Sequence, residues 1–194
     1  GYEKSFLFNS EEKKSNQDAP YLLFVGSRNG YKNFISFIKD YASDKELMMN
    51  FNVIAFGSSD FNSSELNLFR ELKIPTSKIK HISGSDKELA QLYANASAFV
   101  YPSIYEGFGL PLLEAMAAEC PVVAFHSSSI PEVAGNAAEY IYDNVPGEIS
   151  LAIKKVVLSD SRKNQLIIAG RNQLNNFSWE KCADATISSY KKIL

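Results

Sequence analysis

The feature that most limits how this chain can fold is the alternation of short apolar runs with amphipathic stretches. The first run, Tyr21–Gly26, is continuously apolar and ends in Gly, which is typical of a strand buried on both faces. Similar runs follow at Phe51–Phe56, Ile79–Ile82, Ala98–Tyr101, Val122–Phe125 and Tyr140–Tyr142. Their length and composition predict the strands of a sheet.

Stretches with helical periodicity lie between and after these runs. Asn33–Asp44, for example, carries Phe34, Phe37, Ile38 and Tyr41 on one face. The other predicted helices are Asp86–Ala96 with Asp86 as N-cap, Pro111–Ala118, Pro146–Leu158, Ser161–Asn175, and Trp179–Leu194 with Ser178 as N-cap. Strands that alternate with helices of this length indicate a parallel sheet covered on both faces. We therefore predict an α/β fold: a single Rossmann-like domain with a parallel sheet of about six strands flanked by helices.

Size and charge exclude several classes of protein. The chain has 194 residues, enough for one domain, and a net charge of -2. That balance argues against a protein that binds nucleic acid through bulk positive charge. No stretch approaches the roughly 18 apolar residues that a membrane span requires, and the start lacks the apolar core of a signal peptide. Cys120 and Cys182 are the only cysteines, and we predict both as buried thiols in a reducing, cytoplasmic setting.

The first residues differ in character from the rest of the chain. Residues 1–20 are polar and charged, which predicts a linker or solvated tail. Residues 21–194 would then form the folded domain.

Open parallel sheets bind ligands beyond the carboxyl ends of their strands, so the loops after strands are the candidate sites. The loop Gly26–Asn33 follows the first strand and carries Arg28 and Lys32. The fork of Arg and the point charge of Lys both suit phosphate oxygens. The alternative is a glycine-rich turn with two solvated cations.

A second loop, within Tyr101–Ala115, joins the fourth strand to a helix. Gly107 and Gly109 permit positive φ and a close approach of the backbone to a ligand. Glu106 lies in the loop and Glu114 in the helix, so both can face one cleft. The alternatives are a solvated loop carboxylate and a carboxylate that favours the first helical turn. The segment lacks the third glycine of a dinucleotide fingerprint, which argues against an NAD enzyme.

A third loop, His126–Asn136, follows the fifth strand. Ser127–Ser129 could donate to a ligand, but capping of a short helix is the simpler expectation. His81 and His126 have no partners at metal-ligand spacing, and the chain has no Asp-x-Asp cluster. We predict no metal site and no cofactor.

Together these loops resemble the C-terminal, donor-binding half of a retaining glycosyltransferase of family 4, which has the two-domain GT-B fold. The resemblance covers about residues 21–194. Its motifs occur in the order Leu23–Asn33, Lys87–Ala96, Tyr101–Ala117, Pro121–Ala124, Pro131–Ala137 and Phe177–Lys181. This chain departs from the family at Glu119, where Gly is usual and where a Glu at positive φ would be strained.

The resemblance implies a site for a nucleoside-diphosphate sugar. Arg28 and Lys32 would hold the diphosphate and stabilise it as it leaves, while Glu106 would bind sugar hydroxyls. The other implied donor-binding residues are Gly26, Ser27, His81, Ile82, Ser83, Gly107, Phe108, Gly109, Leu110 and Glu114. Of these, the residues at 81–83 would lie near the base, those at 107–110 around the sugar and phosphates, and the carboxylate at 114 on the ribose.

The implied reaction transfers a hexose to an unknown glycan or lipid-linked acceptor without a metal. The implied partner is an N-terminal acceptor-binding domain of the same enzyme, which this sequence does not contain. Two alternatives stay open: a non-catalytic Rossmann-like binding module that kept this fold, and another GT-B-like sugar-nucleotide enzyme.

Overall fold

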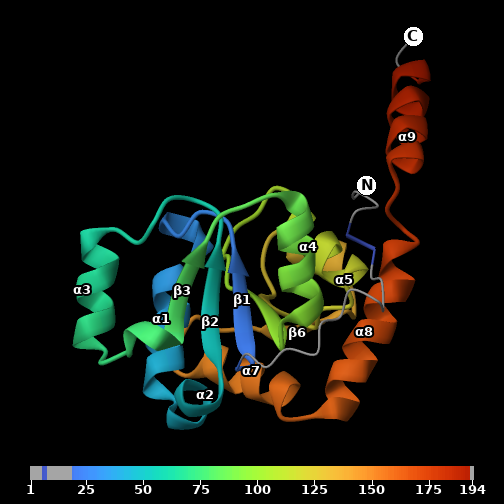
Figure 1. The fold of residues 1–194 in the computed structure, drawn as a ribbon. Coiled ribbons are helices and arrows are strands. Elements are labelled where there is room, and N and C mark those ends of the chain that lie inside the picture. Colours follow the sequence, from blue (N-terminus) through green and yellow to red (C-terminus); the bar gives the residue numbers. More distant parts are fainter. Residues whose placement is uncertain (1–5, 8–18, 193–194) are drawn as a thin grey trace.

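Six parallel strands form one sheet in the order β3-β2-β1-β4-β5-β6 (Figure 1). The structure is a computed structural model and describes residues 6–7 and 19–192. The strands are β1 (Tyr21–Val25), β2 (Asn52–Phe56), β3 (Ile79–Ile82), β4 (Ala98–Tyr101), β5 (Val122–Phe125) and β6 (Ala138–Ile141). The predicted sheet is confirmed, although β6 begins two residues earlier than its apolar run suggested.

The strands with continuous apolar runs occupy the middle of the sheet. Every residue of β1, β4 and β5 is buried, because helices cover both faces there. In β3, at the edge of the sheet, Lys80 is exposed.

The helices form two layers, one on each face of the sheet, apart from the last helix, which extends beyond the sheet (Figure 1). They are α1 (Phe34–Ser43), α2 (Lys45–Asn50), α3 (Ser63–Glu71), α4 (Asp86–Asn95), α5 (Leu110–Ala117), α6 (Ile130–Ala134), α7 (Glu148–Val157), α8 (Asp160–Leu174) and α9 (Trp179–Lys191). One apolar cluster joins α1, α2, α3 and α7 to the sheet, and the other joins α4, α5 and α6 to the opposite face. Each helix predicted from periodicity begins within two residues of its observed start.

Two short helices, α2 and α3, were not predicted. The signal for α3 is present in the sequence, because Asn62 and Glu65 form a capping box at its start. At α4 the predicted N-cap is wrong by one residue: Ser85 caps the helix, whereas Asp86 is its first residue. The predicted cap of α9 is confirmed, since the side chain of Ser178 accepts from the backbone N–H of Lys181.

The N-terminal segment is only partly described. Residues 1–5 and 8–18, which carry most of the predicted linker, lie outside the described residues. Phe6 is buried and packs edge-to-face on Tyr93, with ring centroids 6.1 Å apart. At this position the predicted solvated tail is therefore wrong, because the ring belongs to the core.

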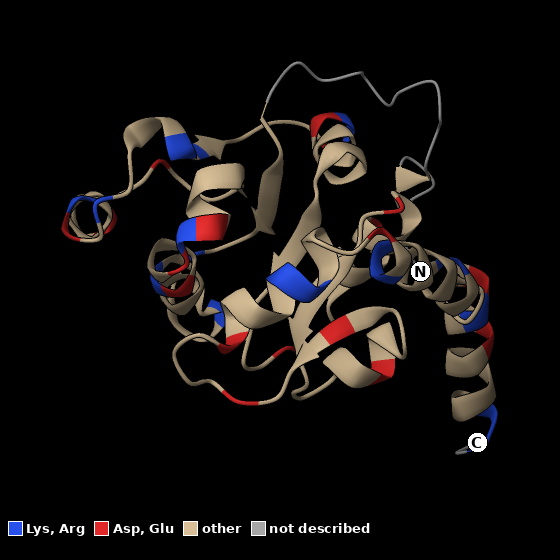
Figure 2. Cartoon of the chain, turned by 90° about the horizontal axis from the view of Figure 1, so that it is seen from below, with Lys and Arg blue, Asp and Glu red and all other residues tan. Residues whose placement is uncertain are grey.

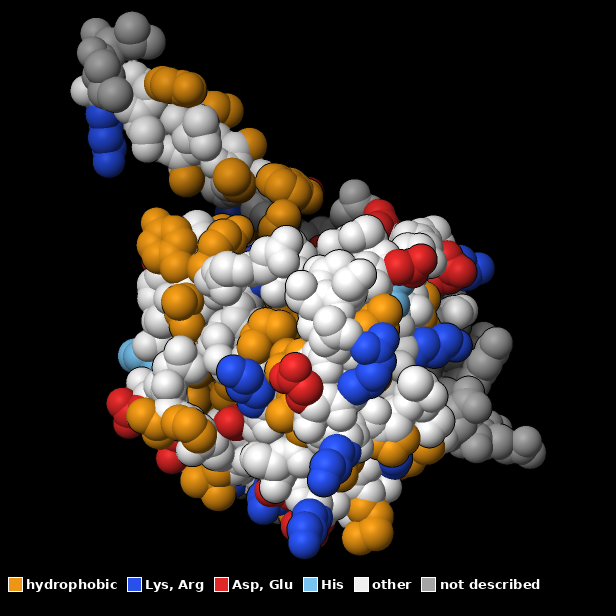
Figure 3. Space-filling view, turned by 90° about the vertical axis from the view of Figure 1, so that its left-hand side faces the viewer, with side chains coloured by type: hydrophobic (Ala, Val, Ile, Leu, Met, Phe, Trp, Pro, Cys, Tyr) orange, Lys and Arg blue, Asp and Glu red, His pale blue; other side chains and the backbone are white. Residues whose placement is uncertain are grey.

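The last helix stands away from the body of the domain. Beyond α8, α9 extends past the edge of the sheet to which the strand arrows point (Figure 1). Hydrophobic side chains line it (Figure 3), and none of its described residues is buried; Trp179 is 58% exposed. Cys120 is buried as predicted, but the predicted burial of Cys182 is wrong, because no part of the chain that the structure describes covers this residue of α9.

The surface carries both signs of charge. Lys and Arg are interspersed with Asp and Glu over the outer helices (Figure 2). Within the described part of the chain, no helix combines the length and apolar character that a membrane crossing requires.

Candidate functional site

The order of the strands reverses between β1 and β4, in the middle of the sheet. From β1 the chain continues to β2 on one side, whereas from β4 it continues to β5 on the other. Open α/β sheets bind ligands outside the carboxyl ends of their strands at such a switch point. The loops after β1 and β4 both lie there, and the backbone N–H of Ile104 donates to the carbonyl of Tyr31 across them (2.9 Å).

A charged pair joins these two loops. Nζ of Lys32, after β1, lies 2.7 Å from Oε1 of Glu106, after β4, and the two side chains are only 14% and 10% exposed. The sequence alternatives of a solvated cation and a solvated loop carboxylate are therefore wrong for both residues. Nζ also lies 5.2 Å from the ring centroid of Tyr101. Burial, and then the charge of Glu106, raises the pKa of the Tyr101 hydroxyl well above its usual range.

Serines after β5 hold the loop that carries Glu106. Oγ of Ser128 accepts from the backbone N–H of Glu106 (2.8 Å). The hydroxyl of Ser129 is shared between the carbonyls of Glu106 (2.9 Å) and Phe108 (3.1 Å). The expected capping role is wrong, since Ser129 stands at the start of α6 but makes no side-chain capping bond.

The start of α5 forms the other side of this loop. Gly109 has φ +101° as predicted, and a Cβ there would lie 3.0 Å from Cδ1 of Leu112. Gly107, for which positive φ was also possible, does not take it. The first backbone N–H groups of α5 carry partial positive charge, and no acidic residue lies in its first turn. Phe108 and Leu110 are exposed beside them.

Glu114 lies one turn further along α5. It is half-buried and accepts from the hydroxyl of Tyr93 (3.3 Å). Burial, followed by the charge of Glu114, raises the pKa of Tyr93. The predicted role of Glu114 on a ribose stays a prediction.

Arg28 has a different environment from Lys32. Its side chain is 4% exposed, and Nε lies 2.7 Å from Oε1 of Glu65 at the start of α3. Nη2 donates to the carbonyls of Ser59 (2.8 Å) and Asp60 (3.1 Å). The solvated alternative is wrong for Arg28 too, and its predicted contact with a diphosphate stays a prediction.

The remaining predicted residues lie around the ends of β1 and β3. Gly26 has φ +114°, and its N–H donates to the carbonyl of Phe56. Oγ of Ser27 accepts from the backbone N–H of Asn29. Nε2 of His81 faces the carbonyl of Gly57 (3.0 Å). Ile82 is half-buried and Ser83 is exposed.

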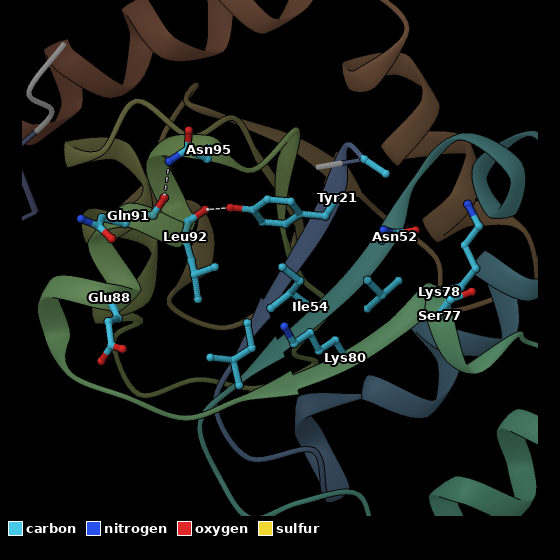
Figure 4. A pocket seen from close by; sticks show the side chains of 13 residues that line it. Tyr21, Asn52, Ile54, Ser77, Lys78, Lys80, Glu88, Gln91, Leu92 and Asn95 are labelled. Carbon is cyan, nitrogen blue, oxygen red and sulfur yellow. Dashed lines mark hydrogen bonds between the residues drawn. The ribbon is translucent and has the colours of Figure 1, made fainter. Parts of the chain in front are cut away.

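A separate hollow of about 450 Å³ opens on the face of the sheet, between β2, β3 and α4 (Figure 4). Ile54 forms part of its floor, and Leu92 of α4 and Lys80 of β3 also line it. Of the predicted donor-binding residues, only Ile82 lines it. The hollow is therefore not the switch-point site.

Two further sequence expectations concern metals and His126. In the part of the chain that the structure describes, no three His, Cys, Asp or Glu side chains are grouped so that they could hold a metal ion. The ring of His126 stacks on Tyr142, with centroids 5.1 Å apart.

The fold and its switch-point site define the class of protein: a Rossmann-like half of a GT-B fold. Sucrose-phosphate synthase from Thermosynechococcus elongatus matches the whole chain over 51% of its own length, with a TM-score of 0.82 and 20% identity. The C-terminal domain of LpcC, a group 1 family glycosyl transferase from Francisella tularensis, matches 91% of this chain over 97% of its own, with a TM-score of 0.74 and 17% identity. At these identities the likeness shows the fold alone.

Sequence comparison identifies the family. Residues 5–173 match the family described as glycosyl transferases group 1, and this chain belongs to it. O-antigen chain mannosyltransferase B of Escherichia coli is 35% identical over 88% of this chain and 45% of its own length. The MMP alpha-(1->4)-mannosyltransferase of Mycolicibacterium hassiacum is 36% identical over 69% of this chain and 33% of its own. The chain thus spans less than half of these relatives.

Proposed function

We propose that this chain is the donor-binding, C-terminal domain of a retaining family 4 glycosyltransferase that acts in the cytoplasm. It would bind a nucleoside-diphosphate hexose, and the whole enzyme would transfer that hexose to a glycan or lipid-linked acceptor without a metal. The lengths of the relatives support a further, acceptor-binding domain elsewhere in the protein. Their names support mannose as the hexose.

The observation that carries the proposal is the Lys32–Glu106 pair at the switch point. A departing diphosphate gains negative charge, so a fixed cation and the N–H groups of α5 stabilise it more than they stabilise the bound donor. Glu106 has the acceptor oxygens that sugar hydroxyls require. Its loop is held by Ser128 and Ser129, so the carboxylate is oriented before a donor arrives.

We assign the roles within the site from the contacts of Lys32 and from the resemblance of the loops. Lys32 is the cation nearest the sugar-binding carboxylate, so we assign the diphosphate to Lys32. Glu114, one turn inside α5, would accept from the ribose, and the residues after β3, from His81 to Ser83, would contact the base. The glycine loop from Gly107 to Leu110 would surround the sugar and phosphates.

The test is calorimetric titration of this chain with GDP, UDP and ADP. We expect saturable binding of one nucleotide, with a Kd between about 10 μM and 1 mM. Glu114→Ala should abolish it, while Glu71→Ala, at an exposed carboxylate on α3, should not. Equal binding by the two variants would contradict the ribose assignment. If no nucleotide binds to this chain or to the longer protein, the non-catalytic module is the better description.

A further inference from the structure

The carboxyl end of β2 leads into a loop that the backbone alone does not stabilise. Gly57 and Ser58 both have positive φ, at +84° and +62°. Positive φ is unfavourable for a non-glycine residue, so it persists only where surrounding contacts hold it. The loop, residues 57–62, therefore requires external support.

Arg28 supplies that support from the loop after β1. Its Nη2 donates to the carbonyls of Ser59 and Asp60, and its Cζ lies 4.8 Å from the ring centroid of Phe61. Glu65 holds the guanidinium in this orientation with both carboxylate oxygens, at 2.7 and 3.2 Å. Three consecutive residues of the loop thus contact one buried side chain.

The same loop fixes the ring of His81 at the end of β3. Nδ1 of His81 lies 2.8 Å from Oδ1 of Asp60, and Nε2 lies 3.0 Å from the carbonyl oxygen of Gly57. The ring of Phe61 lies edge-to-face on the ring of His81, with centroids 5.9 Å apart and an angle of 69° between the ring planes. Arg28 and His81 therefore contact the same loop, through the neighbouring residues Asp60 and Phe61.

Burial and these contacts leave Arg28 little access to a phosphate, since its side chain is only 4% exposed. Nε and Nη2 already have acceptors, and Nη1 is buried without a hydrogen-bond partner among the described residues. The carboxylate of Glu65 offsets the charge of the guanidinium. Burial alone would raise the pKa of Glu65, but hydrogen bonds from Arg28 and from the N–H of Asn62 outweigh it and hold the pKa below its usual range. Glu65 is thus ionised at neutral pH.

We propose that Arg28 is a positioning residue: it holds the loop at residues 57–62 and, through that loop, orients His81 at the base end of the donor site, whereas Lys32 contacts the diphosphate. The inference rests on the proposed function, because it needs a nucleotide at the ends of β1 and β3. It differs from the sequence expectation, in which both cations bind phosphate.

Arg28→Lys tests this directly, because Lys keeps the positive charge but loses the fork that contacts Glu65 and two carbonyls at once. Arg171→Lys is the matched control, since Arg171 makes a similar two-nitrogen contact with Glu119 far from this loop in sequence. Glu65→Gln is the second variant. It leaves Arg28 in place, removes the charge of its partner, and replaces one of the two acceptor oxygens with an amide group that cannot accept.

Two measurements separate positioning from phosphate binding. We expect Arg28→Lys and Glu65→Gln to weaken nucleotide binding by about tenfold and to leave binding of inorganic pyrophosphate within about twofold. Lys32→Met should weaken the binding of both the nucleotide and pyrophosphate, whereas Arg171→Lys should weaken the binding of neither. Loss of pyrophosphate binding in Arg28→Lys to the extent seen in Lys32→Met would overturn the proposal.

The third measurement needs no ligand, so it stays informative if the proposed function fails. In long-range ¹H–¹⁵N spectra, the ring resonances of His81 should shift in Arg28→Lys and Glu65→Gln. They should stay in place in Lys32→Met and Arg171→Lys. Unchanged His81 resonances in both loop variants would overturn the positioning role, whatever the nucleotide titrations show. Shifted resonances in a chain that binds no nucleotide would support the positioning and contradict only the proposed function.

Discussion

Nζ of Lys32 lies 2.7 Å from Oε1 of Glu106, although the two residues are 74 positions apart in the sequence. The pair connects β1 to β4 across the point where the strand order reverses. Within this pair the carboxylate offsets the charge of the ammonium group. An incoming diphosphate would therefore compete with Glu106 for Lys32.

Removing the charge of Glu106 should free Lys32 for a nucleoside diphosphate. We expect Glu106→Gln to raise the affinity for the diphosphate by about threefold, the effect of one modest ion pair. Lys32→Met should lower the affinity by about tenfold, since a hydrogen bond to a charged group is lost. Titration of each variant measures both effects. Equal loss of affinity in the two variants would show that Glu106 does not compete for Lys32.

Ser129→Ala should loosen the loop that carries Glu106. Its hydroxyl contacts the carbonyls of Glu106 and Phe108, so we expect a loss of about 1 kcal/mol in the free energy of unfolding. Binding of a nucleotide-sugar should weaken more than binding of the nucleotide alone. Urea denaturation and paired titrations measure the two effects. Ser161→Ala, at an exposed position of α8, is the control and should change neither.

Asp40 connects α1 to α7 through a buried cap. Oδ1 accepts from the N–H of Gly147 (2.9 Å) and Oδ2 from the N–H of Ile149 (3.0 Å). Because both bonds go to a carboxylate, Asp40→Ala should lower the free energy of unfolding by about 2 to 3 kcal/mol. Chemical denaturation measures it, with Asp184→Ala on exposed α9 as control. A loss no larger than in the control would contradict the capping role.

Glu119 takes positive φ (+57°) directly after Ala118, the C-cap of α5. Positive φ is unfavourable for a residue that carries a Cβ, so the backbone at this position is strained. Glu119→Gly and Glu119→Ala both remove the ion pair with Arg171, so comparison of the two isolates the backbone. We expect the Gly variant to be more stable than the Ala variant by about 1 kcal/mol. Thermal denaturation of the two variants measures this difference. Equal stability would mean that the backbone at residue 119 is not strained.

The lowered pKa of Glu65 predicts an acid dependence of stability. A carboxyl whose pKa is lower in the folded state stabilises the fold above its unfolded pKa, about 4.3, and loses that contribution as pH falls toward the folded value. We expect the stability of the unmodified chain to fall below about pH 4.3 more steeply than that of Glu65→Gln. Denaturation midpoints between neutral and acid pH measure it. Parallel curves would show that Glu65 is not stabilised by Arg28.

Much of the fold followed from local patterns. Runs such as Tyr21–Val25 and Val122–Phe125 predicted buried strands, and the apolar stripe of α1 predicted its helix, because burial repeats with the period of each element. Where such a stripe is absent, the prediction failed. Residues 63–71 were missed, although Asn62 and Glu65 mark their start. The predicted burial of Cys182 also failed, because residue type does not say whether a partner surface is present.

The candidate site, like the fold, could be predicted from the sequence only in part. Loop chemistry and the resemblance nominated Lys32, Glu106 and Arg28 from the sequence alone. Only the tertiary structure paired Lys32 with Glu106, turned Arg28 toward Glu65, and brought the serines after β5 to the loop after β4. The physical reason is that residue type and spacing report the immediate neighbours of a side chain along the chain. Its electrostatic partner is decided by strand order, which brings together segments that are distant in sequence.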